Sequence, residues 1–238
     1  MAKLTYEGVS CFELECEDGS VILMDPCFSI NPYSTRKAEE IQKADAIFIS
    51  HAARDHIGDA LPIARRTGAK IFGPRNIKIL CSLEGIPKGQ FGVMVAGVET
   101  SVNGTRVKAF ETKHGSVYEV KGHYLSDVSV AYMFKLRDDL SIIHLGDTAL
   151  FGDLKMYGEV YKPDVALIPI GKFPGAVTEM DPYEAAIAAK WLGVKLAIPM
   201  HWDFNEQEDF PDIFERELRG QSPECRVKVL KPGEQMVL

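Results

Sequence analysis

The chain has 238 residues, of which 46% are hydrophobic and 26% are charged, and its formal net charge is −7. This composition is typical of a globular protein that buries a substantial core, and we expect one domain over residues 1–238. No stretch approaches the roughly 20 apolar residues of a membrane-spanning helix. The first 20 residues also lack the basic-then-apolar pattern of a signal peptide, so we expect no membrane association.

Charge and cysteine usage narrow the partners and the compartment. An acidic surface repels phosphates, which argues against nucleic acid as a partner. The five cysteines are scattered and include no CxxC pair, which argues against a disulfide framework and favours the cytoplasm. The sequence leaves the oligomeric state open, a homo-oligomer included.

Short apolar runs rich in β-branched residues and bounded by Gly, Pro and Asp predict strands. In chain order they are Val21–Met24, Ala46–Ser50, Lys70–Phe72, Arg106–Glu111, Ser129–Leu136, Ser141–Leu145, Val165–Ile170, Leu196–Met200 and Arg226–Leu230. Helical patterns cover Ile57–Arg66, Pro182–Leu192 and Asp209–Leu218. The second helix has Asp181 as its N-cap and Glu184 three residues later, which is a capping box.

The distribution of these elements predicts the architecture. The first half is rich in strands joined by short turns such as EDGS at 17–20 and VNGT at 102–105, and the second half alternates strand and helix. This mixture favours two sheets with helices on their outer faces over one doubly wound parallel sheet.

Five polar residues follow predicted strands directly or nearly so: His51, His56, His114, Asp147 and His201. Polar residues at strand ends of layered α/β folds converge on one edge, where ligands bind. Histidine and carboxylate are the ligands expected for zinc and its first-row neighbours. Any one such histidine is more often a structural residue, and GDT at 146–148 alone could be a turn. Together the five indicate a metal site.

Seven segments carry a family resemblance: YEGVSCF at 6–12, ILMDPCFSINP at 22–32, SHAARDHIGDA at 50–60, IIHLGDTALFGD at 142–153, PDVALIPIG at 163–171, MDPYEAA at 180–186 and AIPMHWDF at 197–204. The chain resembles a metallo-β-lactamase-fold hydrolase, in the branch similar to L-ascorbate phosphate lactonase. The resemblance implies an αββα sandwich of two mixed β-sheets flanked by helices. It also implies a metal site in a cleft along the edge of the sheets.

The family motif His-x-His-x-Asp-His falls on His51, Ala53, Asp55 and His56. The resemblance implies that His51 and His114 hold a first metal, with Ala53 in place of the remaining histidine. Because a methyl group cannot coordinate a cation, we expect this site to be partial or empty. Many relatives also carry His at the position of Val9, and this second departure favours natural divergence over a single laboratory substitution.

The resemblance implies a second metal site that is complete, held by Asp55, His56 and His201, with Asp147 bridging both sites. We expect this site to fill first, with one or two divalent ions per chain. Zinc is the default, and manganese or iron would suit a site with more carboxylate and open positions. Asp55 and Asp147 are also the candidate catalytic residues, since Asp55 could orient the attacking water and Asp147 could accept its proton.

These features predict a metal-dependent hydrolase that uses metal-activated water on a small anionic metabolite such as a lactone, ester or phosphate ester. Lys172 follows a predicted strand and is the candidate substrate-binding residue, whereas Arg54 is expected to face solvent. His144 is expected to be buried and structural. The alternative, which Ala53 supports, is a non-catalytic metal- or ligand-binding member of the same fold.

Overall fold

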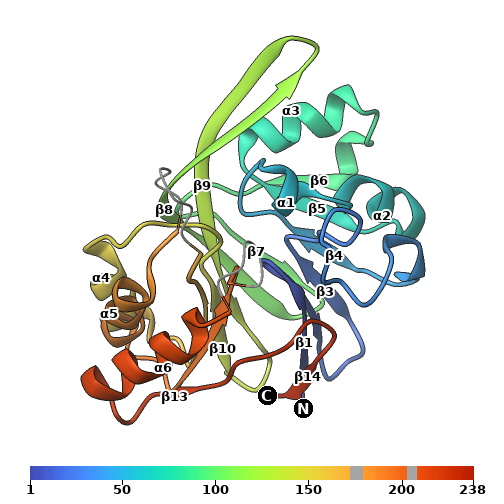
Figure 1. The fold of residues 1–238 in the computed structure, drawn as a ribbon. Coiled ribbons are helices and arrows are strands. Elements are labelled where there is room, and N and C mark those ends of the chain that lie inside the picture. Colours follow the sequence, from blue (N-terminus) through green and yellow to red (C-terminus); the bar gives the residue numbers. More distant parts are fainter. Residues whose placement is uncertain (172–178, 203–207) are drawn as a thin grey trace.

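The computed structural model describes residues 1–171, 179–202 and 208–238, which form two β-sheets packed face to face (Figure 1). In the described residues the first sheet has the strand order β14 (Gln235–Val237), β1 (Lys3–Gly8), β2 (Cys11–Glu15), β3 (Val21–Met24), β4 (Ala46–Phe48), β5 (Lys70–Gly73), β6 (Phe91–Val93). The second has the order β13 (Arg226–Val227), β12 (Leu196–Met200), β11 (Val165–Pro169), β10 (Ser141–His144), β9 (His123–Lys135), β8 (Thr105–Val120), β7 (Glu99–Val102).

Both sheets are mixed, as predicted. In the first sheet β14, β1, β2 and β3 pair antiparallel, and β3 to β6 pair parallel. The second sheet repeats this pattern, with β7 to β10 antiparallel and β10 to β13 parallel. In each sheet the C-terminal ends of the parallel strands therefore point to the same edge. Side chains that follow these strands can meet there.

The main core fills the space between the two sheets. Phe48 of the first sheet stacks on Phe72 with ring centroids 4.7 Å apart, and it meets Tyr132 of the second sheet edge-on at 5.2 Å. Leu167 and Ile198 of the second sheet belong to the same buried cluster. Burial of these apolar side chains is the main term that holds the sheets together.

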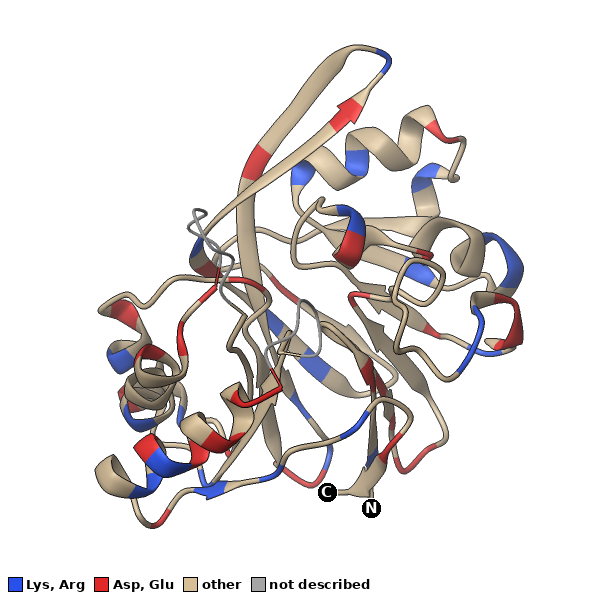
Figure 2. Ribbon diagram, in the orientation of Figure 1, with Lys and Arg blue, Asp and Glu red and all other residues tan. Residues whose placement is uncertain are grey.

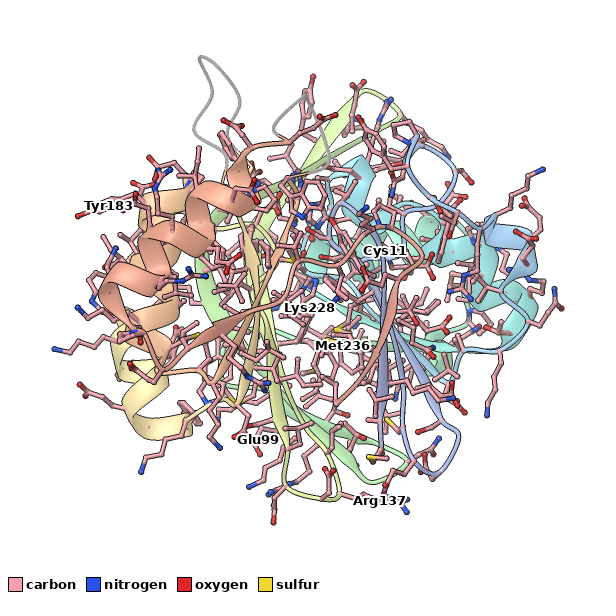
Figure 3. The ribbon with its side chains drawn as sticks, turned by 60° about the horizontal axis from the view of Figure 1, so that its bottom comes forward. Cys11, Glu99, Arg137, Tyr183, Lys228 and Met236 are labelled. Carbon is pink, nitrogen blue, oxygen red and sulfur yellow. The ribbon has the colours of Figure 1, made fainter. Side chains whose placement is uncertain are left out.

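Helices cover the outer face of each sheet, which completes the expected αββα sandwich (Figure 1). The first sheet is covered by α1 (Arg54–Ile57), α2 (Ala60–Thr67) and α3 (Arg75–Leu83), with short 3-10 turns η1 (Ala38–Glu40) and η2 (Lys88–Gln90) nearby. The second sheet is covered by α4 (Asp153–Tyr161), α5 (Pro182–Leu192) and α6 (Phe210–Gln221). Figure 3 shows this layer from another side, with the exposed Tyr183 of α5 at its outer rim.

The helix prediction was correct for α5 and wrong at the start of the Ile57–Arg66 helix. Asp181 and Glu184 form the expected capping box, in which the Glu184 amide donates to the Asp181 side chain at 2.9 Å. The other helix is interrupted at Gly58, whose φ of 33° ends α1 before α2 begins. A Cβ at position 58 would lie 2.4 Å from the Pro26 carbonyl oxygen, so this break depends on glycine.

The two predicted strands Arg106–Glu111 and Ser129–Leu136 are parts of a much longer hairpin. β8 and β9 continue to Val120 and His123, and the hairpin projects beyond the sheets (Figure 1). The register shifts between Glu111 and Gly115, where β8 carries a bulge. The prediction stopped at Glu111 because the projecting part is largely exposed and carries no continuous apolar run.

Other boundaries differ by smaller amounts. The predicted strand Arg226–Leu230 is reduced to Arg226–Val227, since only these residues pair with β12. The sequence interpretation missed β1, β2, β6, β7, β14, α3 and α4, which are short or carry weak start signals. No helix within the described ranges has the length and apolar character needed to cross a membrane.

Candidate metal centre

The six side chains predicted as metal ligands come together at one edge of the sandwich. Three of them follow strand ends: His51 comes after β4, Asp147 after β10, and His201 directly after β12. Asp55 and His56 lie in α1, which begins three residues after His51. The sixth, His114, lies inside β8 at the bulge, not after a strand end as predicted. A bulge changes the direction of the side chains around it, and this one includes His114.

Asp147 lies at the centre of this arrangement. Its Oδ2 atom is 3.1 Å from His56 Nε2, 3.6 Å from His201 Nε2 and 3.7 Å from His51 Nε2. The side chain is only 4% exposed. Three imidazole nitrogens that converge on one buried carboxylate oxygen form the donor set expected around a divalent cation.

The first ligand group consists of His51, His114 and Asp147, whose nearest donor atoms lie within 4.8 Å of one another. The rings of His51 and His114 meet edge-on with centroids 4.8 Å apart. Ala53 is the N-cap of α1 and provides no donor. This group therefore offers two imidazoles and a share of one carboxylate.

The second ligand group consists of Asp55, His56 and His201, also within 4.8 Å of one another. Asp55 Oδ2 lies 3.4 Å from His201 Nε2 and 3.8 Å from His56 Nε2. His56 and His201 are buried, whereas Asp55 is 25% exposed. Asp55 is therefore the member of the group that solvent can reach.

Asp25 orients His51 and His56, directly or through Ser50, by hydrogen bonds to the ring nitrogens that face away from Asp147. The His56 ring donates from Nδ1 to Asp25 Oδ2 at 2.8 Å, which leaves Nε2 directed toward Asp147. The Ser50 hydroxyl donates to the same carboxylate oxygen at 2.6 Å and accepts from His51 Nδ1 at 3.0 Å. Carboxylates in this position fix the tautomer and ring orientation of metal-binding histidines.

His201 is held by an unusual backbone. Its φ is 68°, and its amide donates to the Val9 carbonyl oxygen at 2.7 Å. Val9 itself has a φ of 56°, which is costly for a β-branched residue, and the Tyr6 hydroxyl also donates to its carbonyl at 3.0 Å. Strained backbone of this kind is concentrated at functional sites, and here it sets the direction of the His201 ring.

Two buried atoms of the site offer electron pairs that a metal could accept. Burial and the adjacent His56 lower the pKa of the His51 imidazole to about 3, so its ring is neutral at physiological pH. Since His51 Nδ1 bonds to Ser50, its Nε2 carries the free electron pair. Within the described residues this Nε2 and Asp147 Oδ1 are buried and have no hydrogen-bond partner. Both atoms would be costly to bury without a cation.

The remaining groups are paired as ions. Burial alone would lower the pKa of the His56 imidazole, but the carboxylates of Asp147 and Asp25 outweigh it and raise that pKa well above its usual value. In the same way Asp147 and Asp55 raise the pKa of His201 to about 9. These histidines in turn hold the pKa values of Asp147 and Asp55 below their usual range despite burial. In the metal-free protein, protons therefore occupy positions that a cation would take.

Several other residues have structural roles or lie elsewhere. His144 is buried, and its Nε2 donates to the Ser10 carbonyl at 2.9 Å, which confirms its structural assignment. Trp202 packs against both the inter-sheet core and the outer core of the second sheet. Arg54 is exposed, as expected. Lys172, the predicted substrate-binding residue, lies outside the described residues.

Sequence reasoning missed three polar residues of the site: Asp25, Ser50 and Glu179. Asp25 follows β3 directly, so it shows the same strand-end signal as His51 and His201 and could have been found. Ser50 directly precedes His51 and has no signal of its own. Glu179 lies with Asp147 and His201 in a third group of potential ligands, and nothing in its local sequence indicates this.

With this geometry in place, comparison with known proteins identifies the family. A family model described as the Beta-lactamase superfamily domain matches residues 3–201. The chain belongs to the beta-lactamase superfamily. The predicted resemblance to metallo-β-lactamase-fold hydrolases is thereby confirmed.

Relatives that match this chain over almost their whole length are named as hydrolases. The chain is 35% identical to a UPF0173 metal-dependent hydrolase of Methanobrevibacter smithii over 98% of its length and 95% of the relative's. A UPF0173 metal-dependent hydrolase of Rubrobacter xylanophilus is 34% identical, with 98% and 96% covered. The solved structure of Igni18, a metallo hydrolase from Ignicoccus hospitalis, has a TM-score of 0.83 and 32% identity and covers 99% of this chain and 97% of its own. The chain therefore belongs to the family of these UPF0173 metal-dependent hydrolases.

Proposed function

We propose that this metal-dependent hydrolase uses a metal-activated water to cleave a small anionic metabolite, namely a lactone, ester or phosphate ester. The observation that carries the proposal is the convergence of three imidazole Nε2 atoms on Asp147 Oδ2 at 3.1–3.7 Å. A buried cluster of this kind has no structural purpose that an apolar core would not serve better.

We assign the ligands in two groups that share Asp147. His51 and His114 form the weaker group because Ala53 supplies no donor, and Asp55, His56 and His201 form the stronger one. The stronger group fills first, so the protein holds one ion tightly and a second one loosely or not at all. Zinc, manganese and iron are all compatible with nitrogen and carboxylate donors.

A divalent cation in this cage would lower the pKa of water toward neutrality and polarise the scissile carbonyl or phosphoryl group. Asp55 is partly exposed, so its carboxylate can orient a water at the mouth of the site. Asp147 Oδ1 is free of hydrogen bonds within the described residues and can accept the proton that this water loses. The two carboxylates therefore have separate roles in addition to binding.

The anionic character of the substrate is supported by Arg54, directly before Asp55. The Arg54 side chain is exposed, and within the described ranges no side-chain hydrogen bond or ion pair is seen for it. It borders a hollow of about 180 Å³ that Ser29, Ile30 and Tyr118 also line. A guanidinium at this place can pair with a carboxylate or phosphate group of the substrate.

The other expectations stay predictions. They are a single domain over residues 1–238, the narrower likeness to L-ascorbate phosphate lactonase, cytoplasmic location, an open oligomeric state, and no nucleic acid as partner.

Figure 2 shows Lys and Arg interspersed with Asp and Glu over the helices and the hairpin. Such mixing does not produce the one-sided basic surface that nucleic-acid binding favours.

Ala53 favours one second candidate, a protein that binds metal or ligand without turnover. The deciding experiment measures hydrolysis of lactone, ester and phosphodiester substrates by the wild type after chelation and after metal is added back. Asp147→Asn is the test variant, and Glu159→Gln, which removes an exposed carboxylate on α4, is the matched control. Metal-dependent hydrolysis that is lost only in Asp147→Asn supports the proposal. Metal binding without hydrolysis of any substrate class would support the binding protein instead.

A further inference from the structure

The β8 bulge that carries His114 is held on both sides by hydrogen bonds. On one side the Lys113 amide donates to the Thr148 hydroxyl at 3.0 Å, and the Ala149 amide donates to the Lys113 carbonyl oxygen at 3.2 Å. Thr148 is fully buried and directly follows Asp147. The residue before His114 is therefore tied to the loop that carries Asp147.

On the other side Ser116 ties the bulge to the family motif. The Ser116 hydroxyl oxygen accepts from the Ala52 amide at 2.9 Å, and Ala52 directly follows His51. Both Ser116 and Ala52 are buried. His114 thus lies between two connections, and they lead to its two partners in the first ligand group, His51 and Asp147.

Asn76 anchors Ser116 from α3, which lies beside the hairpin (Figure 1). The buried side-chain amide of Asn76 donates to the Ser116 hydroxyl oxygen at 2.7 Å and to the Ser116 carbonyl oxygen at 3.2 Å. The Asn76 backbone amide donates to the Asp127 carboxylate of β9 at 3.2 Å. The Ser116 hydroxyl oxygen therefore uses both lone pairs as an acceptor, one toward α3 and one toward Ala52, and its position is fixed from two directions.

We propose that Ser116 and Asn76 are positioning residues that fix His114 relative to His51 in the first ligand group. His114 lies at a bulge, where the ladder of hydrogen bonds between the strands is locally interrupted, so strand pairing alone does not fix its direction. The hydrogen bonds of Ser116 supply this constraint. Hydrogen-bonded neighbours of metal ligands tune metal affinity in this way.

The inference rests on the proposed metal centre and deepens it. Because Ala53 supplies no donor, the ligands of the first group can hold an ion only while their spacing is kept. The second group is built mainly on α1 and on the residue after β12, and not on the bulge. Loss of the Ser116 hydrogen bonds should therefore release the more loosely bound ion and leave the tightly bound ion in place.

The competing role for these two residues is to hold the hairpin against α3 without any effect on the ligands. Ser116→Ala removes the oxygen that accepts from the Ala52 amide. Asn76→Ala removes only the anchor on α3 and leaves the hydrogen bond to Ala52. Ser126→Ala, which removes an exposed hydroxyl from the same hairpin, is the matched control.

The test titrates the chelator-treated full-length protein and its variants with Zn²⁺ up to millimolar concentration, and it records the visible absorption that each equivalent of Co²⁺ adds. Ser116→Ala should weaken binding of the second ion by about 10- to 100-fold and leave the affinity for the first ion unchanged. The absorption that the second equivalent of Co²⁺ adds should fall accordingly. Asn76→Ala should show the same change to a smaller extent, and it decides the matter if Ser116→Ala does not fold. Ser126→Ala should match the wild type.

A purely structural role predicts a different pattern. Ser116→Ala would then lower the unfolding temperature of the metal-free protein and either keep both affinities or reduce both by the same factor. Either result overturns the inference, while the metal centre itself stands. A wild-type protein that takes up only one ion even at millimolar metal also overturns it, because His114 then holds no second ion. If the wild type binds neither Zn²⁺ nor Co²⁺, the proposed function fails and this inference fails with it.

Discussion

Asp25 and His56, which are 31 residues apart in the chain, form a fully buried pair in which His56 Nδ1 lies 2.8 Å from Asp25 Oδ2. The same carboxylate accepts from the Ser50 amide at 2.7 Å and from the Ser50 hydroxyl. Asp25 thus fixes His56 directly and His51 through Ser50. Although it lies outside the two ligand groups, it determines where two ligand nitrogens point.

The Asp25→Asn substitution is expected to lower metal affinity by about 10- to 100-fold, as loss of such orienting partners does in other metal sites. The physical reason is that an amide lacks the charge that holds the His56 ring and can reverse the direction of the hydrogen bond. Affinity is measured by competition with a chelator of known strength. Glu159→Gln should bind like the wild type. An unchanged affinity in Asp25→Asn would show that packing alone orients His56.

The Ala53→His substitution is expected to raise the metal content toward two ions per chain and to increase the hydrolysis rate. Position 53 has an extended backbone (φ −69°, ψ 150°) at the N-cap of α1, so a histidine there does not interrupt the helix. Metal content is measured by elemental analysis after dialysis, and Ala53→Gln, which adds bulk without an imidazole, is the comparison. If occupancy rises and no substrate is hydrolysed, the non-catalytic alternative gains.

Metal binding is expected to release protons near neutral pH. The pKa of His201 is about 9 in the metal-free protein, above its unfolded value of 6.5, and that of His56 is raised as well. Raised histidine pKa values stabilise the metal-free fold fully below the unfolded pKa, and this contribution is lost as pH rises through the folded pKa. A cation must displace these protons, so its affinity rises with pH up to about 9.

Calorimetry at pH 7.5 in buffers of different ionisation enthalpy measures this proton release. The apparent binding enthalpy should vary with the buffer at pH 7.5, and the variation should shrink once the pH exceeds the pKa of His201. Binding enthalpies that are independent of the buffer at pH 7.5 would contradict the ion-paired state of the metal-free site.

The Arg54→Ala substitution is expected to raise KM for anionic substrates by about tenfold, the effect of about 1.4 kcal/mol, with a small change in kcat. A neutral ester should be hydrolysed as by the wild type, because it has no group for the guanidinium to meet. Lys78→Ala, which removes an exposed cation on α3, is the control for net charge. Equal losses for neutral and anionic substrates would mean that Arg54 supports α1 and does not bind substrate.

Some parts of the structure could be predicted because their sequence signal is local. Val21–Met24 and Leu196–Met200 match β3 and β12 residue for residue, since each is a continuous apolar run that is buried on both faces. The capping box of α5 is likewise a local hydrogen-bond pattern. The extent of the β8–β9 hairpin could not be predicted, because its exposed tip lacks a buried face to impose a pattern.

The site itself divides in the same way. His51, Asp147 and His201 carry a strand-end signal, and the family motif adds Asp55 and His56. His114 lies at a bulge, and its place depends on the register of two strands that the sequence pattern does not reveal. Glu179 reaches Asp147 and His201 only because the chain folds back past Gly171, which is a tertiary property.

The proposed metal ligands come from both sheets, and this affects how the protein unfolds. His51, Asp55 and His56 are attached to the first sheet and its helix layer, while His114, Asp147 and His201 belong to the second sheet. A cation bound by both sets acts as a noncovalent cross-link between the halves of the chain, and a ligand at 100 times its Kd adds about 2.7 kcal/mol to the free energy of unfolding. Scarcity of the metal would then shorten the lifetime of the protein toward proteases as well as its activity.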